Sequence, residues 1–178
     1  MNFEEKVISS RPVFDGKVFK VRVDSVILPD GAEATRELIA HNGGVGVIAL
    51  TENNEVFMVS QYRIAAKCEM LEIPAGKLEK GEEPLECGKR ELIEEIGYEA
   101  SDFEYLGAYY ATPGYCEEKL HIYLARNLKW VGQNLDEGEF LNVKKYHINE
   151  LYNMVMNNEI YDCKTAIAIL KTKEIISK

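Results

Sequence analysis

The chain has 178 residues, 46% of them hydrophobic and 29% charged, with a formal net charge of −9 at pH 7. This length suits one domain with a buried core, and the negative charge argues against a nucleic-acid backbone as a partner. No apolar run approaches the ~20 residues that cross a bilayer, and Met1–Lys6 lacks the pattern of a secretory signal. We therefore expect a cytoplasmic protein without a membrane partner. The four scattered cysteines are interpreted as reduced thiols.

The N-terminal region is predicted to form strands. Lys17–Leu28 partly alternates apolar with polar side chains, the triplet Pro29-Asp30-Gly31 is typical of a turn, and Ala32–His41 continues as a second strand. Val18–Leu28 offers a long apolar edge. We treat residues 1–41 as an N-terminal strand region within a single domain that spans residues 1–178.

Further strands are predicted between this region and the first helix. Two stretches rich in Val, Ile and Phe, Val45–Thr51 and Glu55–Arg63, are separated by Glu52-Asn53-Asn54, which is typical of a hairpin turn. A shorter strand-like stretch, Leu71–Pro74, then leads into a loop.

A helix is predicted to begin at Pro84 and to end before Gly97, since proline suits the first helical position and glycine the residue after the last turn. At 3.6 residues per turn, Glu91, Glu94 and Glu95 fall within an arc of roughly 100°. This acidic arc lies beside an apolar stripe made of Leu85, Leu92, Ile93 and Ile96.

The acidic arc predicts a cation site. Carboxylates three and four residues apart repel one another, at about 0.2–0.5 kcal/mol for each pair on an isolated helix, and Arg90 offsets only part of this. A hard divalent cation such as Mg²⁺ or Mn²⁺ prefers oxygen ligands and would offset the rest. It would also let an acidic protein accept a polyanionic phosphate. The alternative is a solvated acidic helix face.

The C-terminal half contains both kinds of element. Three strands and two helices are expected, at Phe103–Ala111, Leu120–Leu128 and Phe140–Tyr146, and at Ile148–Asn157 and from Cys163 to about Ile175. A strand-rich chain with one central and one terminal helix favours an α+β sandwich.

From Gly76 to Gly97 the chain follows the pattern G-x5-E-x7-R-E-L-x-E-E-x-G. This segment resembles the signature box of the Nudix hydrolases. Only the next position departs, where Tyr98 replaces a bulky aliphatic residue, which affects packing rather than chemistry. The resemblance implies the Nudix fold, an α/β/α sandwich with a mixed sheet, here with an N-terminal antiparallel strand extension.

The resemblance also implies roles for the box residues. The backbone carbonyl of Ala75 joins Glu91 and Glu95 as ligands of two or three Mg²⁺ or Mn²⁺ ions, with Glu94 as a further ligand or a supporting group. Four box residues are implied to hold the loop against the helix: Gly76, Glu82, Arg90 and Gly97.

Other segments are similar to the ADP-ribose pyrophosphatase group of this superfamily. Thr112-Pro113-Gly114-Tyr115 places a proline sixteen positions after Gly97, and Gln61–Ala65, Leu71–Gly76 and Asp162–Thr165 also match the group. The implied reaction is hydrolysis of ADP-ribose to AMP and ribose 5-phosphate.

Substrate contacts are implied for Arg63, Arg36, Glu37, Glu72, Pro113 and Gly114. A guanidinium such as that of Arg63 can grip a phosphate through two hydrogen bonds. Each motif has an alternative: Pro113-Gly114 as a plain turn, Arg63 as a surface or ion-paired arginine, and Arg36-Glu37 as charges on a strand face.

The residue that orients the attacking water is expected in the acidic stretch Leu135–Phe140. We favour Glu139 over Glu137, because Gly138-Glu139-Phe140 leading into a strand fits the group better. Glu139 is thus predicted to be catalytic together with Glu91 and Glu95, and it is also counted among the predicted metal ligands. The alternative is a solvated acidic loop.

Three other functions stay open. The substrate can be another sugar nucleotide or a dinucleotide pyrophosphate, the chain can be a non-catalytic module that senses ADP-ribose, or it can be a plain interaction protein. The resemblance further implies a homodimer in which the N-terminal strands of one subunit help to bind the nucleotide of the other, and the apolar edge at Val18–Leu28 permits this.

Overall fold

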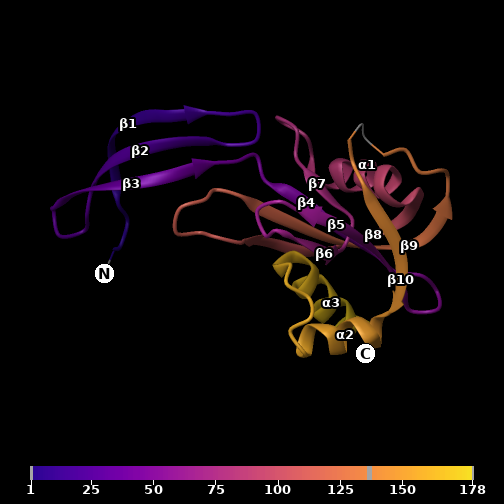
Figure 1. The fold of residues 1–178 in the computed structure, drawn as a ribbon. Coiled ribbons are helices and arrows are strands. Elements are labelled where there is room, and N and C mark those ends of the chain that lie inside the picture. Colours follow the sequence, from indigo (N-terminus) through magenta and orange to yellow (C-terminus); the bar gives the residue numbers. More distant parts are fainter. Residues whose placement is uncertain (1, 136–137, 178) are drawn as a thin grey trace. The chain divides into compact units, whose positions relative to one another are not determined.

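The computed structural model describes residues 2–135 and 138–177 (Figure 1). Contacts group the chain into two compact units, Met1–Gly43 with Tyr109–Lys119, and Gly44–Ala108 with Leu120–Lys178. The expectation of a single domain stays a prediction. No helix in the described part of the chain is long and apolar enough to cross a membrane.

The first unit is built on an antiparallel sheet of three strands, β1 (Lys6–Asp15), β2 (Lys20–Ile27) and β3 (Glu33–Ala40). The prediction that Val18–Leu28 forms an apolar edge of the sheet is wrong, because β2 lies between β1 and β3 and pairs with both. Strand β1 is the exposed edge, and the sequence did not reveal it. All ten of its residues are exposed, so it lacks the alternation that a half-buried strand shows.

The turn at Pro113-Gly114 belongs to this first unit. The backbone amide of Cys116 donates to the carbonyl of Thr112 at 3.0 Å, which closes the turn. The chain then pairs with β3, because the amide of Ile39 donates to the carbonyl of Tyr115 at 2.8 Å.

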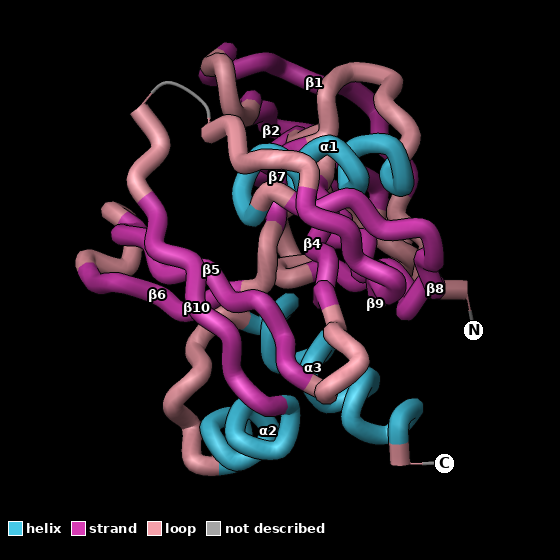
Figure 2. The backbone as a smooth tube through the Cα atoms, turned by 90° about the vertical axis from the view of Figure 1, so that its right-hand side faces the viewer, coloured by secondary structure: helices cyan, strands magenta, loops and turns pink. Residues whose placement is uncertain are grey.

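The second unit contains two sheets (Figure 2). The first has the order β7-β4-β9-β8 and is mixed, since β4 runs parallel to β9 and antiparallel to β7. The second has the order β10-β5-β6 and is antiparallel. The strands are β4 (Gly44–Ala49), β5 (Glu55–Arg63), β6 (Cys68–Glu72), β7 (Ala75–Lys77), β8 (Tyr98–Tyr110), β9 (Lys119–Trp130) and β10 (Leu141–His147).

Helices cover both faces of β4. Helix α1 (Pro84–Ile96) packs on one side and α3 (Cys163–Ile176) on the other, with α2 (Ile148–Met156) against α3 (Figure 1). The period of two along a strand explains this, because Val45 and Val47 point toward Gly88 of α1 while Gly46 faces Lys164 of α3. The predicted α/β/α sandwich with a mixed sheet is therefore confirmed.

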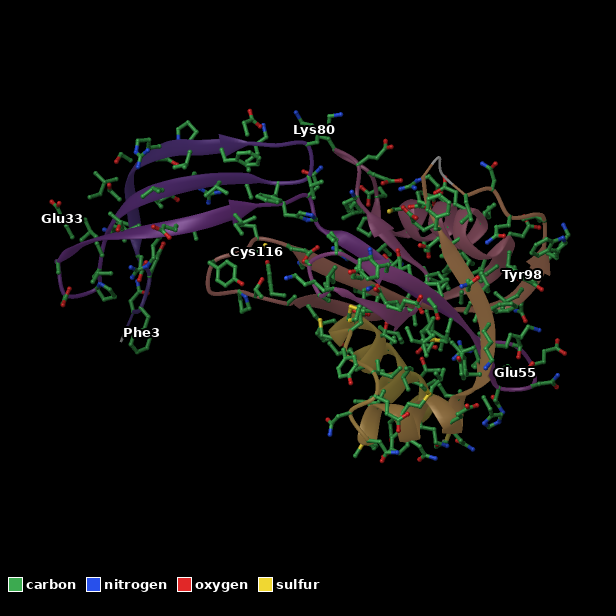
Figure 3. The ribbon with its side chains drawn as sticks, in the orientation of Figure 1. Phe3, Glu33, Glu55, Lys80, Tyr98 and Cys116 are labelled. Carbon is green, nitrogen blue, oxygen red and sulfur yellow. The ribbon has the colours of Figure 1, made fainter. Side chains whose placement is uncertain are left out.

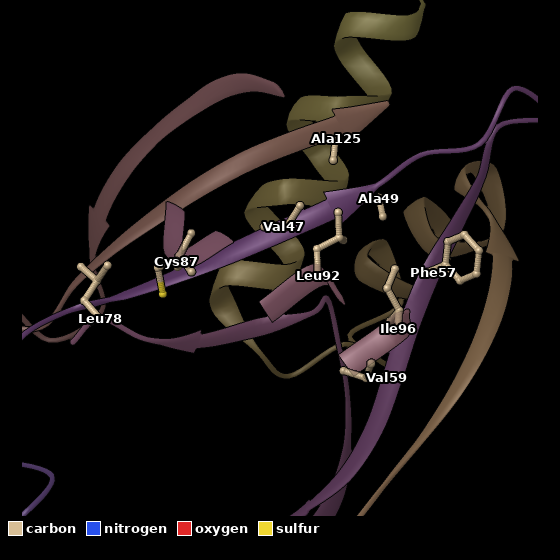
Figure 4. Packing of buried hydrophobic residues seen from close by; sticks show 10 residues of the cluster. Val47, Ala49, Phe57, Val59, Leu78, Cys87, Leu92, Ile96 and Ala125 are labelled. Atoms are coloured by element: carbon tan, nitrogen blue, oxygen red, sulfur yellow. The ribbon is translucent and has the colours of Figure 1, made fainter. Parts of the chain in front are cut away.

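The core of the second unit lies between α1 and the strands (Figure 4). Leu92 and Ile96 of the predicted stripe are fully buried, whereas Leu85 and Ile93 are half-buried. A Cβ on Gly88 would lie only 3.1 Å from a methyl group of Val47, so glycine lets the helix approach β4 closely. The buried cluster comprises Val45, Val47, Ala49, Phe57, Val59, Leu78, Cys87, Leu92, Ile96 and Ala125.

Tyr98, the departure from the box pattern, has a packing role as expected (Figure 3). Its ring lies against Phe57, with 4.6 Å between ring centroids, and meets Trp130 edge-on at 5.2 Å. Such tilted and edge-on pairs are favourable arrangements of aromatic rings. Tyr98 thus joins the start of β8 to the core beneath α1.

Candidate active site

Both ends of α1 are formed as the sequence predicts. Pro84 lies in its first turn, and Gly97 ends it in the left-handed conformation, with φ 75° and ψ 20°. The Gly97 amide donates to the carbonyl of Ile93 at 2.9 Å. A Cβ on Gly97 would lie 2.4 Å from the Trp130 ring, so the position also demands glycine for lack of space.

Strand β7, which precedes the loop to α1, lies directly on the carboxylate of Glu91. A Cβ on Gly76 would lie 1.7 Å from Glu91 Oε1, far inside any real contact. The Glu91 residue is 9% exposed. The glycine of the box therefore allows the backbone of β7 to pass over a buried carboxylate.

Glu95 is buried beside the same strand. It is 3% exposed, and its Oε2 accepts a hydrogen bond of 2.9 Å from the backbone amide of Ala75. Burial raises the pKa of Glu95 to about 8, the Ala75 amide opposes this rise, and the carboxylates of Glu91 and Glu139 add to it. Burial likewise raises the pKa of Glu91, against the effect of Arg90. These two groups resist ionisation because the charged form is poorly solvated.

Arg90 holds the acidic groups of the box together. Its Nε and Nη2 donate to Glu82 at 3.1 and 3.3 Å, while Nη1 donates to Glu91 at 2.8 Å and to Glu94 at 2.9 Å. Glu82 also accepts from the amide of Glu79 at 2.9 Å, inside the loop. The geometry thus supports the roles predicted for Glu82 and Arg90.

The arrangement fits a divalent cation. Among residues 2–135 and 138–177, no three acidic, histidine or cysteine side chains already converge in the geometry of a metal site. Yet Glu91 and Glu94 share the guanidinium of Arg90, and burial raises the pKa values of both Glu91 and Glu95. Hard oxygen donors crowded in this way suit Mg²⁺ or Mn²⁺.

Glu139 lies near these carboxylates. It is close enough for its charge to raise the pKa of both Glu91 and Glu95. Its role in orienting water stays a prediction. Glu137, the alternative, lies outside the described residues.

Arg63, the last residue of β5, forms an ion pair with Glu72, the last residue of β6. Arg63 Nε and Nη2 donate to the two oxygens of Glu72 at 2.6 and 2.7 Å. Lys164, which the sequence analysis did not single out, donates to Glu72 Oε2 at 2.5 Å and pairs with Asp162 at 2.9 Å. Burial of Glu72 favours its neutral form, but Arg63 and Lys164 outweigh burial and lower its pKa.

These contacts bear on two predicted substrate-binding residues. Glu72 is 2% exposed and has both oxygens occupied, while the Arg63 side chain is 41% exposed. Arg63 is therefore ion-paired and open to solvent at once. A substrate contact by either residue stays a prediction, and one by Glu72 requires a change of partner.

The other predicted substrate-binding residues belong to the first unit. Arg36 of β3 donates from Nε to Glu5 at 2.9 Å, and its neighbour Glu37 pairs across the sheet with Val23. Pro113 and Gly114 form the turn that precedes the pairing with β3. Within this unit the structure thus brings the turn next to the strand that carries Arg36 and Glu37.

Comparison with known proteins identifies the family. Residues 40–162 match the family model of the NUDIX domain, and residues 5–39 match that of the nucleoside diphosphate sugar hydrolase N-terminal domain. The chain therefore belongs to the Nudix family. With the signature box complete and assembled around α1, it is a hydrolase of that family.

Several relatives match nearly the whole chain. The chain is 43% identical to the methanol dehydrogenase activator of Bacillus methanolicus, over 94% of this chain and 91% of that protein. It is 41% identical to the ADP-ribose pyrophosphatase of Bacillus subtilis (strain 168), over 98% of this chain and 97% of that protein. A crystal structure of an ADP compounds hydrolase has a TM-score of 0.88 at 19% identity, covering 99% of this chain and 97% of that one, and shows the shared fold.

Proposed function

We propose that this protein hydrolyses ADP-ribose to AMP and ribose 5-phosphate with the help of Mg²⁺ or Mn²⁺. The observation that carries the proposal is the pair of buried carboxylates, Glu91 and Glu95, beneath the backbone of Ala75 and Gly76. The choice of substrate is supported by the relatives called ADP-ribose pyrophosphatase, of 41% and 34% identity, the second from Mycobacterium tuberculosis.

The cations, two or three per site, would be held by Glu91, Glu94, Glu95 and the carbonyl of Ala75. A cation held there supplies positive charge to the diphosphate and makes a water molecule a better nucleophile. Arg90 keeps its contact with Glu82, which holds the loop in place beside the helix.

Glu139 accepts the proton of the attacking water. The water oxygen bonds to one phosphorus of the diphosphate, the bond from that phosphorus to the bridging oxygen breaks, and the bridging oxygen leaves on the other phosphate. Arg63 contacts a phosphate oxygen, and its fixed fork of donors binds the group equally in the ground state and in the transition state. Catalysis by these side chains is chiefly positioning and charge stabilisation.

We propose further that the protein is a cytoplasmic homodimer formed through the N-terminal strands. Strand β1 exposes Val7, Ile8, Val13 and Phe14, each more than half exposed, along an unpaired sheet edge. Exposed apolar edges of this kind favour pairing with another chain. The nucleotide contacts of Arg36, Glu37, Pro113 and Gly114 belong to this part of the proposal. Light scattering on the purified protein tests the dimer, and a monomer at all concentrations contradicts it.

The substrate test is a panel of ADP-ribose, ADP-glucose, GDP-mannose and a dinucleotide pyrophosphate, with products separated by chromatography. We expect ADP-ribose to have the highest kcat/KM, to give AMP, and to lose turnover with a chelator. The variant Glu95→Gln should lose turnover by several orders of magnitude. Preference for another compound would refute ADP-ribose as the substrate. Near wild-type turnover of Glu95→Gln would refute the role of Glu95 in the active site.

A second candidate is activation of a methanol dehydrogenase, favoured by the relative of that name, which is 43% identical to this chain. The test is the rate of a purified methanol dehydrogenase with and without this protein. Stimulation by the wild type and none by Glu95→Gln would tie activation to the hydrolytic site. An unchanged rate with both proteins contradicts this function.

A further inference from the structure

A buried lysine lies next to the candidate active site. Lys164, in the first turn of α3, is 9% exposed. Lysine is almost never fully buried unless its charge is paired. Here the ammonium group pairs with Glu72 at 2.5 Å and with Asp162 at 2.9 Å. The box motif and the proposed mechanism assign it no role.

Glu72 carries two cationic partners with different access to solvent. The side chain of Lys164 is 10% exposed, whereas that of Arg63 is 41% exposed. Arg63 uses Nε and Nη2 on Glu72, and no hydrogen bond of its Nη1 is seen within the described ranges 2–135 and 138–177. One partner is therefore fixed in the interior, and the other reaches outward with a donor to spare.

The residues around Lys164 are hydrogen-bonded to one another. Asp162 caps α3 by accepting from the Thr165 amide at 3.0 Å. The hydroxyl of Thr165 in turn accepts from the backbone amide of Ile73 at 2.9 Å, which ties the start of α3 to the residue after Glu72. The charges of Lys164 and Arg63 both act on Glu95, so this network borders the box carboxylates.

If Arg63 were the only cation paired with Glu72, it could not leave Glu72 to bind the substrate. Removing the only partner of a buried carboxylate leaves an uncompensated charge, which is strongly unfavourable. If Arg63 alone neutralised Glu72, its transfer to a phosphate would leave such a charge behind. With Lys164 in place, Glu72 stays paired when Arg63 moves.

We propose that Lys164 is a positioning residue that lets Arg63 exchange Glu72 for a phosphate oxygen of the substrate. The proposal deepens the proposed function and rests on it. Lys164 itself does not touch the substrate. It acts through Glu72, by supplying the charge that frees Arg63.

The test compares Lys164→Met in two backgrounds. In the wild type we expect KM to rise about tenfold with kcat changed by less than about twofold, because Arg63 stays on Glu72 and ground-state binding is lost. In the Glu72→Gln background, where no buried charge holds Arg63, the same substitution should change KM less than about threefold. Lys173→Met, which removes a lysine farther along α3, serves as the matched control and should leave both constants unchanged.

An equal rise of KM in both backgrounds would overturn the proposal, because Lys164 would then act independently of Glu72. An effect of Lys164→Met on kcat alone would also overturn the proposal. Turnover of ADP-ribose by the wild type tests the proposed function separately. The KM ratios are measured with whichever compound of the panel is cleaved best, so failure of one proposal is distinguishable from failure of the other.

A second measurement does not depend on the folding of Lys164→Met. The Nε–H resonance of Arg63, assigned by its loss in Arg63→Lys, is followed in ¹⁵N NMR spectra while ADP-ribose is added with Mg²⁺ to Glu139→Gln. This variant lacks the group that accepts the proton of the attacking water but keeps Glu91, Glu94 and Glu95. We expect a saturable shift as the bond to Glu72 is exchanged for one to phosphate. A resonance that stays in place at saturation would overturn the exchange.

Discussion

Adjacent glutamates of α1 have very different surroundings. The Glu94 side chain is 22% exposed and bonds to Arg90, whereas Glu95 is 3% exposed and bonds to the Ala75 amide. The helical step of about 100° turns one carboxylate toward the guanidinium and the other beneath the loop. The sequence places both on one acidic arc, but burial by β7 depends on contacts made in the fold.

The raised pKa of Glu95 predicts how the stability of the cation-free protein depends on pH. Its carboxyl has a pKa of about 8 in the folded chain against 4.5 as the reference value. Between these values the folded state binds more protons than the unfolded one, so the free energy of unfolding falls as pH rises through this window. We expect a loss on the order of 3–5 kcal/mol between pH 5 and pH 8.

Urea unfolding of chelator-treated protein across that range measures this slope. Glu91, whose pKa is also raised, adds in the same direction. Glu72 and Glu82, whose pKa values are lowered, lose their stabilising contributions only below the window. Glu95→Gln should remove most of the slope. Identical pH profiles for the wild type and this variant contradict the assignment.

The contact of Gly76 with Glu91 predicts a specific loss of activity. In Gly76→Ala the new methyl group has to displace either β7 or the carboxylate, because its ideal position is 1.7 Å from Glu91 Oε1. Since a misplacement of about 1 Å can cost about a hundredfold, we expect turnover to fall at least that far. Steady-state kinetics with Mg²⁺ measures this.

Gly81→Ala is the matched control for that prediction. Gly81 lies in the loop between β7 and α1 with φ 80°, and nothing lies within 4 Å of an added Cβ. This substitution costs backbone strain, roughly 1 kcal/mol, but meets no carboxylate. Its turnover should stay within about threefold of the wild type. A comparable loss in both variants means that strain in the loop, and not the contact with Glu91, is the cause.

At the level of elements, the segment after β9 caps the carbonyl end of α1. The amides of Val131 and Gly132 donate to the carbonyl of Gly97 at 2.9 and 3.2 Å, and the side chain of Gln133 donates to the carbonyl of Glu95 at 2.5 Å. The last carbonyls of a helix need partners of this kind. The segment therefore steadies the turn of α1 that carries two box carboxylates.

The variant Gln133→Ala should loosen that turn. Loss of one hydrogen bond to a partly buried carbonyl costs about 1 kcal/mol, so we expect faster hydrogen exchange at the end of α1 with little change elsewhere. Asn134→Ala is the control, because Asn134 contacts the carbonyl of Glu94 through its backbone amide. If hydrogen exchange in α1 is the same in both variants, the side chain of Gln133 has no such role.

Local signals explain which elements could be predicted. The ends of α1 follow from Pro84 and Gly97, which act within one turn of the chain. Strand β1 escaped prediction because its residues are all exposed, and pairing with β2 holds it in place. The pairing of Lys164 could not be predicted for another reason. Its partner Glu72 is 92 residues away in sequence, so no local pattern reveals the pairing.

At the level of the whole molecule, an acidic chain is expected to bind a substrate that is itself anionic. The net charge is −9, and the box concentrates glutamates on one helix. Divalent cations at the box would resolve this conflict, because they would neutralise the carboxylates and attract the diphosphate of the proposed substrate. The same reasoning predicts that bound cations contribute part of the stability of the folded protein.

Addition of Mg²⁺ should therefore raise the midpoint of thermal unfolding. A ligand that binds only the folded state at one hundred times its Kd contributes about 2.7 kcal/mol. For a chain of this size that corresponds to a shift of roughly 5–10 °C. Because protons compete with the cation for Glu95, the shift should be larger at pH 8 than at pH 6. Glu95→Gln should lose most of the shift. NaCl at matched ionic strength separates cation binding from general screening, and an equal shift with NaCl would mean that no cation site exists.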